Sequence, residues 1–282
     1  MAPPARVAGR PPRPAMRSDP RRLGADAEAA ARYDALHADR TDDVAFYARQ
    51  AADAGGAVLE VGCGTGRVAL AAAAAGAAMV GLERAAPLLS VAAGKRARSP
   101  AAVRARLALV RADMRAYAFR RPFARVLMPF RVFQAMLTVD DQLSALAAAR
   151  AALAPGGRLV LDLFDPRLDV LAEAAEGPVP LAPTGRSFRD GRGEWRERVA
   201  ARYDLESQIV DLTYVYERAG DDGAVADRSF ERIRVRYFTR WEFEHLLARA
   251  GYEVEALYGG WDGSPPAAEG EDMIWIARKA DA

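Results

Sequence analysis

A glycine-rich segment that follows a short apolar run constrains the fold of this chain most. Residues 58–61 read Val-Leu-Glu-Val, and Gly62, Gly64 and Gly66 follow at alternate positions. The apolar run predicts a strand, and the alanine-rich run after Arg67 predicts a helix. Glycines let the backbone turn sharply and let a ligand approach with no Cβ in the way, while the helix points its free N–H groups at that ligand. The segment therefore predicts a strand, a tight ligand-binding turn and a helix.

Short apolar runs alternate with helical segments up to about residue 164. Nearly continuous apolar runs are typical of strands that are buried on both faces of a parallel sheet. Because helices separate these runs, the pattern predicts βαβ units. The expected strands are 57–61, 79–82, 107–110, 125–128 and 158–164, and the expected helices are 25–54 with a break near Thr41, 66–75, 86–97 and 140–153.

The hydrophobic period changes to two between about residues 185 and 238. Trp195 and Glu197 share one face of an expected strand, whereas Arg196 and Arg198 share the other. This alternation is typical of half-exposed antiparallel strands. A helix at 241–249 and strands at 252–258 and 272–278 follow. We therefore expect an α/β fold with a Rossmann-like, seven-stranded, mostly parallel sheet whose last strand is antiparallel, and an antiparallel insert of three to four strands after the fifth strand.

These patterns divide the chain into a tail at 1–22, a core at 23–166, an insert at 167–240 and the rest of the core at 241–282. The tail holds six prolines and six arginines against one acid, Asp19, and this composition cannot bury enough apolar surface to fold. We expect a solvated tail, or a true start near Met16. The tail contributes +5 to a net charge of +2, which leaves the body near −3. The folded part is therefore not expected to bind nucleic acid.

The single cysteine, Cys63, excludes an intramolecular disulfide and fits a reducing compartment. The N-terminus has no apolar signal-peptide region, and the longest apolar run, 68–82, is too short to span a bilayer. We therefore expect a cytoplasmic protein with no membrane partner. No His, Cys or Asp cluster has the spacing of metal ligands, so no metal is expected.

Acidic residues stand near the ends of successive expected strands, where ligands of open α/β sheets bind. Glu60 precedes the glycines, Glu83 ends the second strand and Asp113 follows the third. An acid about 20 residues beyond the glycines can accept hydrogen bonds from both hydroxyls of a ribose. These acids suit a neutral adenosine with a cationic sulfonium and an amino group better than a pyrophosphate. The alternatives are that Glu83 is a solvated acid and that Asp113 caps the next turn.

These motifs resemble those of the class I S-adenosylmethionine (SAM)-dependent methyltransferases. The segment 58–67 is similar to their motif I, Glu83 matches their second-strand acid, which is more often Asp, and Asp113-Met114-Arg115 looks like the segment that places an acid near the adenine amino group. Ala124 stands where an acid is usual. The segment 153–159 looks like the family's entry into the fifth strand. The segments 127–130, 133–134, 236–239 and 258–265 resemble a subgroup that includes relatives of the glycine/sarcosine and amino-sugar N-methyltransferases.

The resemblance implies an enzyme that moves a methyl group from SAM to a small soluble acceptor, at nitrogen more readily than at oxygen, and an oligomer is possible. His37 lies in a helix that folds over the cofactor in this family, and it is the candidate base for a protonated acceptor. The alternative is that His37 makes an ordinary packing contact. The implied cofactor site consists of Tyr33, Glu60, Gly62, Cys63, Gly64, Gly66, Glu83, Arg84, Asp113, Met114 and Pro129.

Other functions stay open at this point. One is a non-catalytic SAM sensor or interaction module whose insert binds a partner. Another is a nicotinamide-dependent dehydrogenase, which the G-x-G-x-G spacing and Glu60 disfavour. Within the insert, a set of arginines either orients an anionic group of the acceptor or forms the solvated face of the strands. These are Arg196, Arg198, Arg232, Arg234 and Arg236.

Overall fold

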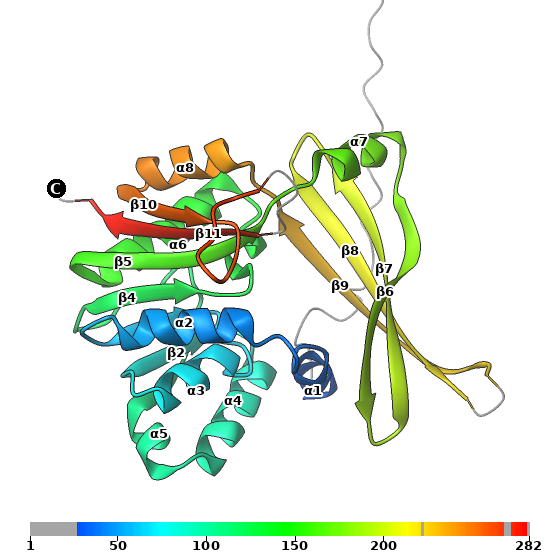
Figure 1. Cartoon of the computed structure of the whole chain (residues 1–282), viewed down its shortest axis with the longest axis horizontal. Helices are drawn as coiled ribbons and strands as arrows, with labels where there is room; N and C mark the ends of the chain where they lie inside the picture. Colours follow the sequence, from blue (N-terminus) through cyan, green and yellow to red (C-terminus); the bar gives the residue numbers. More distant parts are fainter. Residues whose placement is uncertain (1–26, 221–222, 268–271, 281–282) are drawn as a thin grey trace, which may run out of the picture.

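The computed structural model describes residues 27–220, 223–267 and 272–280 (Figure 1). The predicted tail, 1–22, lies outside the described residues. One sheet has the strand order β10-β11-β5-β4-β1-β2-β3. Its members are β1 (Val58–Val61), β2 (Met79–Glu83), β3 (Leu107–Arg111), β4 (Phe123–Met128), β5 (Leu153–Phe164), β10 (Tyr252–Tyr258) and β11 (Asp272–Lys279).

This seven-stranded sheet is mostly parallel. β1 pairs in parallel with β2 and β4, β2 pairs with β3, and β4 pairs with β5. β11 runs antiparallel to both β5 and β10, so the predicted Rossmann-like sheet with an antiparallel last strand is confirmed. The chain moves outward from β1 to β3 and then returns to β4 on the other side of β1. This reversal places the carboxyl ends of β1 and β4 side by side, which is where ligands of such sheets bind.

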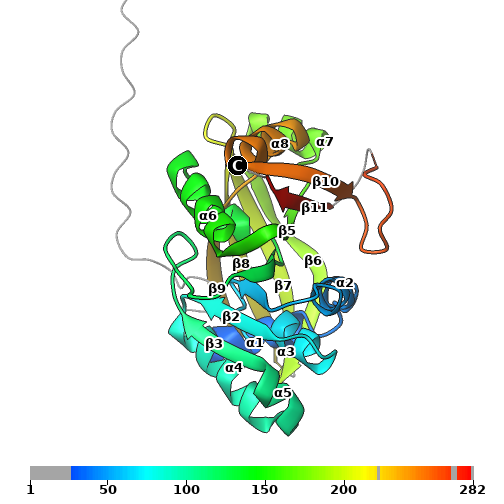
Figure 2. The ribbon, with the colours of Figure 1, turned by 90° about the vertical axis from the view of Figure 1, so that its left-hand side faces the viewer.

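Helices cover both faces of the sheet (Figures 1 and 2). Leu59 and Val61 pack on one face with α6 and α8, and Val58 packs on the other with α2, α3 and α5. The split follows from the pleat of β1, whose successive side chains point to opposite faces. No helix in the described ranges has both the length and the apolar character of a bilayer span. The helices are α1 (Ala27–Leu36), α2 (Asp42–Ala52), α3 (Arg67–Ala74), α4 (Ala86–Arg98), α5 (Ala101–Arg106), α6 (Val139–Ala152) and α8 (Arg240–Arg249).

A second sheet, of four antiparallel strands, stands beside the carboxyl ends of the parallel strands (Figure 1). It confirms the antiparallel insert predicted after the fifth strand. One of its faces packs on α1, where Leu36 clusters with Phe188, Trp195 and Tyr216. The segment begins with α7 (Leu168–Glu176) and continues with β6 (Val179–Asp190), β7 (Gly193–Asp204), β8 (Ile209–Ala219) and β9 (Val225–Arg236).

The structure differs from the sequence expectations at α5, at α7, at the start of β5 and at an unexpected 3₁₀ helix, η1 (Val132–Ala135). α5 is not predicted, because Val103 is its one buried residue and a single apolar residue shows no period. α7 is not predicted either, and it exposes 76% of Leu168. β5 begins at Leu153 rather than at Arg158, because Leu153 already pairs with Phe123 of β4. The register then shifts, and regular pairing resumes where Arg158 pairs with Arg125.

Candidate functional site

The glycine segment forms a tight turn between β1 and α3. Gly62, Gly64 and Gly66 have positive φ angles of 73°, 55° and 82°. A Cβ at Gly62 would lie 2.4 Å from Cγ2 of Val132, so only glycine fits beneath the loop that follows β4. A Cβ at Gly64 would meet no atom within 4 Å. The turn therefore presents bare backbone to open space at Gly64.

Glu60 lies buried beneath this turn and is 2% exposed. Its Oε2 atom has no hydrogen-bond partner among the described residues. Burial raises the pKa of Glu60 to about 8, although the charge of Arg67 acts in the opposite direction. A buried carboxyl oxygen without a partner is costly unless a ligand donates to it. Glu60 therefore offers a place for a cationic or hydrogen-bond-donating group.

Glu83 ends β2 with its carboxylate fixed by two backbone groups. The N–H of Gly64 donates to Oε2 at 3.1 Å, and the N–H of Ala85 donates to Oε1 at 2.7 Å. Each oxygen keeps a lone pair for another donor. Glu83 is therefore tied to the glycine turn and still able to accept hydrogen bonds from a ligand.

Asp113 follows β3, the strand next to β2, at the same carboxyl-end edge of the sheet as Glu83. Arg115 binds its carboxylate through Nε at 3.0 Å and Nη2 at 2.8 Å, and Nη1 of Arg84 lies 3.9 Å away. The hydrogen bond from Arg115 lowers the pKa of Asp113 to about 2. The backbone N–H of Arg115 also donates to Oδ1 at 3.0 Å, which is a turn cap of the kind that the sequence left as an alternative. Met114 packs against the core.

Cys63 occupies the turn as a small packed residue. Its N–H donates to the carbonyl oxygen of Leu82 at 2.9 Å, and its side chain is buried. A Cβ at Gly81 would lie 2.9 Å from its Sγ, so the thiol fills the space beside β2. Burial raises the pKa of the Cys63 thiol well above its usual range. The thiol therefore stays protonated and is a poor nucleophile.

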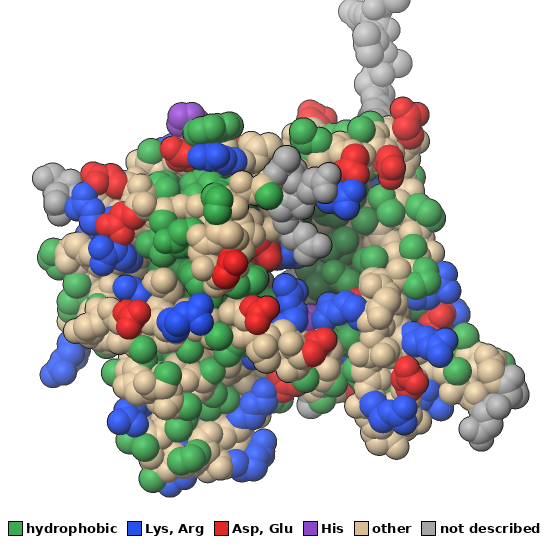
Figure 3. All heavy atoms as spheres, viewed as in Figure 1, with side chains coloured by type: hydrophobic (Ala, Val, Ile, Leu, Met, Phe, Trp, Pro, Cys, Tyr) green, Lys and Arg blue, Asp and Glu red, His purple; other side chains and the backbone are tan. Residues whose placement is uncertain are grey.

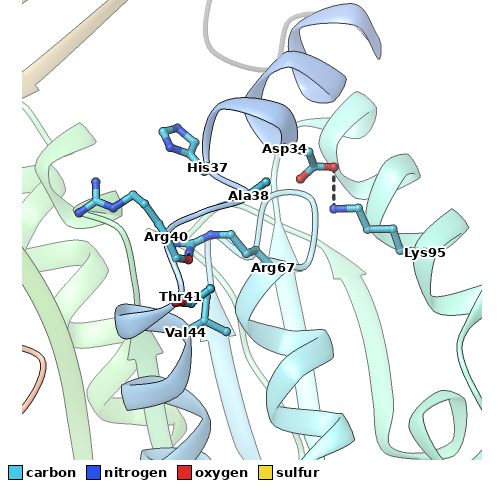
Figure 4. A pocket seen from close by; sticks show the side chains of 8 residues that line it. All are labelled: Asp34, His37, Ala38, Arg40, Thr41, Val44, Arg67 and Lys95. Atoms are coloured by element: carbon cyan, nitrogen blue, oxygen red, sulfur yellow. Dashed lines mark hydrogen bonds and ion pairs between the residues drawn. The ribbon is translucent and has the colours of Figure 1, made fainter. Parts of the chain in front are cut away.

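Asp34 attaches α1 to the glycine turn. The hydroxyl of Thr65 donates to Oδ1 of Asp34 at 2.5 Å, and Nζ of Lys95 lies 2.6 Å from Oδ2. These contacts hold α1 beside a surface pocket of about 380 Å³ (Figure 4). Its wall carries Arg40 together with two cations in ion pairs, Lys95 with Asp34 and Arg67 with Asp43 at 2.5 Å. The pocket is lined by Asp34, His37, Ala38, Arg40, Thr41, Val44, Arg67 and Lys95.

An aromatic cluster forms where α1 meets the loop after β4. The ring centroid of Phe130 lies 5.7 Å from that of Tyr33 and 4.8 Å from that of His37. The guanidinium carbons of Arg40 and Arg67 lie 5.3 Å and 5.0 Å from the Phe130 centroid. Burial raises the pKa of Tyr33 to about 12, so its phenol is neutral at pH 7. The cluster forms an aromatic wall with cations at its edge.

The second sheet holds His37 through Arg186 of β6. Nη2 of Arg186 lies 2.7 Å from Nδ1 of His37 and donates to the carbonyl oxygen of Leu36 at 2.6 Å. Because a guanidinium only donates, Nδ1 is the acceptor and the ring proton lies on Nε2. Burial, followed by the charges of Arg186, Arg67 and Arg40, lowers the pKa of His37 to about 3. While Arg186 is bound, neither ring nitrogen of this neutral imidazole is free to accept a proton.

Asp162 of β5 holds the loop that follows β4. Its Oδ1 accepts hydrogen bonds from the Tyr47 hydroxyl at 2.6 Å and the Phe130 N–H at 2.7 Å, and its Oδ2 accepts one from the Arg131 N–H at 3.0 Å. Phe130 and Arg131 have φ angles of 60° and 61°, which residues with side chains rarely adopt. Pro129, which precedes them, is buried.

The arginines of the second sheet lie mainly on the face away from α1. Trp195 packs towards α1, so its neighbour Arg196 points the other way. On that outer face Asp211 pairs with Arg202 and Arg234 at 2.8 Å. This position favours the solvated-face alternative for Arg196, Arg198, Arg232 and Arg234, whereas an acceptor-orienting role stays a prediction. Arg236 instead contacts Gln208 and Glu242.

The structure brings most of the predicted site residues to one edge of the sheet, although their roles stay predictions. Sequence reasoning missed Asp34, Phe130 and Arg186, which contact the site from distant parts of the chain. Asp162 carried a signal, because an acid inside an apolar strand needs partners. Within the described ranges no cluster of three His, Cys, Asp or Glu side chains could hold a metal. Around the glycine turn lie Tyr33, Glu60, Gly62, Cys63, Gly64, Gly66, Glu83 and Pro129, and next to it lie Arg84, Asp113 and Met114.

Comparison with known proteins agrees with this geometry. Residues 58–157 match a family model described as a methyltransferase domain. A dTDP-3-amino-3,6-dideoxy-alpha-D-glucopyranose N,N-dimethyltransferase of Streptomyces fradiae is 27% identical over 265 residues, which cover 86% of this chain and 93% of the relative. A cypemycin N-terminal methyltransferase of a Streptomyces species is 25% identical over 234 residues, which cover 80% of this chain and 84% of the relative.

Solved structures share the fold. The CcbJ methyltransferase of Streptomyces caelestis superposes with a TM-score of 0.70 at 21% identity, covering 86% of this chain and 90% of its own. SAM-bound CalS10, an amino pentose methyltransferase of Micromonospora echinaspora, superposes with a TM-score of 0.66 at 24% identity, covering 89% and 95%. These matches support neither the sensor nor the dehydrogenase alternative. The chain is a SAM-dependent methyltransferase with a Rossmann-like fold, and it resembles the small-molecule methyltransferases of this class.

Proposed function

We propose that this methyltransferase transfers the methyl group of SAM to an amino group of a small soluble acceptor held between the two sheets. The observation that carries the proposal is the aromatic wall of Phe130, Tyr33 and His37, which lies between the glycine turn and the second sheet. The space-filling view shows a hollow between the two sheets (Figure 3). A hollow of this kind suits a small ligand rather than a macromolecule.

The residues at the glycine turn fit SAM. The unpartnered Oε2 of buried Glu60 suits the cationic amino group. Arg40, which adds positive charge to the ion-paired wall of the adjoining pocket, suits the carboxylate. The bare backbone at Gly64 lets the ligand approach closely, and Glu83 keeps lone pairs for the ribose hydroxyls. We assign the adenine to the region of Asp113. SAM supplies a methyl group that its sulfonium has already activated.

The acceptor side of the site is formed by side chains from three parts of the chain. Phe130 comes from the loop after β4 and Arg186 from the second sheet. His37 comes from the turn directly after α1 rather than from the helix in which it was expected. Tyr214 of β8 packs against the cluster of Leu36, Phe188, Trp195 and Tyr216, and burial raises the pKa of its phenol to about 12. We infer that these side chains orient the acceptor and exclude water, which are the main protein contributions to an in-line displacement.

The chemistry of His37 favours nitrogen over oxygen as the methylated atom. An alcohol needs a base to remove its proton, and the hydrogen bond from Arg186 occupies the one ring lone pair of His37. A neutral amine already carries a lone pair, so desolvation and alignment suffice. Nε2 of His37, which carries the ring proton, can donate a hydrogen bond to another group of the acceptor.

The names of two relatives support an amine acceptor. One relative is named for an amino-dideoxy sugar nucleotide, and the other for the N-terminus of a peptide. The test incubates the full chain and isotope-labelled SAM with dTDP-3-amino-3,6-dideoxyglucose, a short peptide with a free α-amine, and the 3-hydroxy analogue of the sugar as a matched control. A bacterial metabolite extract, incubated with the full chain and labelled SAM, is then searched for labelled products by mass spectrometry.

We expect label on nitrogen in a small molecule and no label on the 3-hydroxy sugar. Label that appeared only in nucleic acid or folded protein would overturn the small-molecule assignment. A labelled methyl ether whose formation was lost in His37→Ala would overturn the preference for nitrogen.

A further inference from the structure

The carboxylate of Asp162 joins three elements that meet beside the candidate site. It accepts hydrogen bonds from the Tyr47 hydroxyl of α2 and from two successive backbone N–H groups, those of Phe130 and Arg131. The guanidinium of Arg131 is held in turn by Asp272 of β11 at 2.6 Å. Asp162 is 2% exposed, so water does not compete for these bonds.

The loop after β4 depends on these bonds for its conformation. Phe130 and Arg131 both have left-handed φ angles, and two such residues in succession strain the backbone. The carboxylate offsets the strain by accepting both N–H groups. An ionised carboxylate accepts at every lone pair, whereas a protonated one gives up part of its capacity to its own proton. The loop is therefore fixed best when Asp162 is ionised.

The position of Phe130 follows from this loop. Its ring packs edge-on against Tyr33 and His37 and lies next to the guanidinium groups of Arg40 and Arg67. Asp162 itself touches none of these groups. Its carboxylate acts on the wall only through the backbone of the loop.

We propose that Asp162 is a positioning residue for methyl transfer, because its ionised carboxylate holds Phe130 in the wall that orients the acceptor. The proposal rests on the proposed function, which assigns this wall to the acceptor. If Asp162 holds this role, the geometry of the site depends on whether its carboxyl group is protonated.

The groups that face Asp162 determine when that proton binds. Burial raises the pKa of Asp162 to about 6, the hydrogen bond from Tyr47 and the charge of Arg131 lower it, and the charge of Asp272 raises it. The charge of Asp43 also acts on the hydroxyl of Tyr47. Below about pH 6 the carboxyl group is protonated and the loop loosens, and above it the loop is fixed.

The first experiment follows the two backbone donors directly. In the ¹⁵N-labelled full chain, the amide resonances of Phe130 and Arg131 should titrate with a midpoint near pH 6, and they should stay flat in Asp162→Asn. Hydrogen exchange over 129–135, corrected for intrinsic rates, should become about tenfold faster in that variant. Asp165→Asn, which removes a neighbouring acid from the same strand end, should keep the wild-type titration. A wild-type titration that was absent, or one that persisted in Asp162→Asn, would overturn the proposal.

The second experiment tests the effect on turnover. With an amine acceptor, Asp162→Asn should lower kcat about tenfold while the Kd for S-adenosylhomocysteine changes less than about twofold. In the pH profile of kcat, the fall at acid pH that is caused by protonation of Asp162 should disappear in the variant. A fall caused by protonation of the acceptor amine should remain in both proteins. An unchanged kcat and pH profile would overturn the positioning role. The amide titration needs no acceptor, so a wrong acceptor class would leave that result readable.

Tyr47→Phe covers the case in which Asp162→Asn fails to fold. It removes one donor and leaves the carboxylate on both backbone groups. Because the hydroxyl lowers the pKa of Asp162, the midpoint of the two amide titrations should move to higher pH. A midpoint that did not move would contradict the proposed network.

Discussion

Glu60 carries a proton that should leave when the cofactor binds. Burial raises the pKa of Glu60 to about 8, so its carboxyl group is mostly protonated at pH 7. A cationic amino group beside it favours the ionised form and lowers this pKa. We expect SAM binding at pH 7 to release up to about one proton. The binding enthalpy measured by calorimetry should then vary with the ionisation enthalpy of the buffer, and a buffer-independent enthalpy would contradict the assignment.

Glu60→Gln is the matched variant for this test. It should abolish the proton release and weaken SAM binding by about 1.5–3 kcal/mol, the usual range for a hydrogen bond to a charged group. In the absence of SAM, by contrast, Glu60→Gln should make the folded protein more stable at alkaline pH. Because the folded-state pKa of about 8 exceeds the usual 4.5, ionisation of Glu60 destabilises the fold as the pH rises between these values. The variant should therefore have the higher Tm at pH 8 and above.

His37 should contribute to positioning rather than to proton transfer. In His37→Asn the amide oxygen can replace Nδ1 as the acceptor for Arg186, so we expect kcat to fall by less than about tenfold, whereas the loss of a general base costs about 10²–10⁴. Because the pKa of His37 is near 3, no limb between pH 5 and 8 should belong to it. A hundredfold loss together with the disappearance of such a limb would restore the general-base role.

Among the elements, α1 is the one whose attachment should control cofactor affinity. Asp34 connects it to Thr65 and Lys95, at side-chain exposures of 26% for Asp34 and 29% for Lys95. Because these groups are partly exposed, we expect Asp34→Ala to weaken SAM binding by about 1 kcal/mol. Hydrogen exchange over 27–36 should become faster. Asp39→Asn, an exposed acid in the connection after α1, should change neither quantity.

The two faces of the four-stranded sheet should respond differently to the loss of an arginine. Arg234→Gln removes an exposed ion pair with Asp211, so unfolding free energy should change by less than about 1 kcal/mol and the KM for the acceptor should not change. Arg186→Gln removes the contact with His37 on the inner face and should raise that KM. Steady-state kinetics and thermal unfolding of Arg234→Gln and Arg186→Gln measure these two effects. Equal effects on KM would show that the outer face also meets the acceptor.

At the scale of the whole molecule, the sequence predicts what depends on local periodicity. Buried parallel strands appear in the sequence as runs of apolar residues. The strands of the half-exposed sheet appear as alternating apolar and polar residues, so both sheets could be predicted. Contacts between distant segments were not, because the bond between His37 and Arg186 joins positions 149 residues apart. The left-handed turn at Phe130 and Arg131 has no glycine or asparagine to indicate it.

The attachment of α1 to both sides of the site has a consequence for successive turnovers. Asp34 ties the helix to the cofactor side, and Leu36 and His37 tie it to the second sheet. We expect release of S-adenosylhomocysteine to move α1, because Asp34 ties this helix to the glycine turn, and the same movement would open the acceptor side. An amine that receives two methyl groups should therefore leave and return between them. A time course of the reaction should show the singly methylated compound accumulating in solution before the doubly methylated one appears, which is distributive rather than processive behaviour.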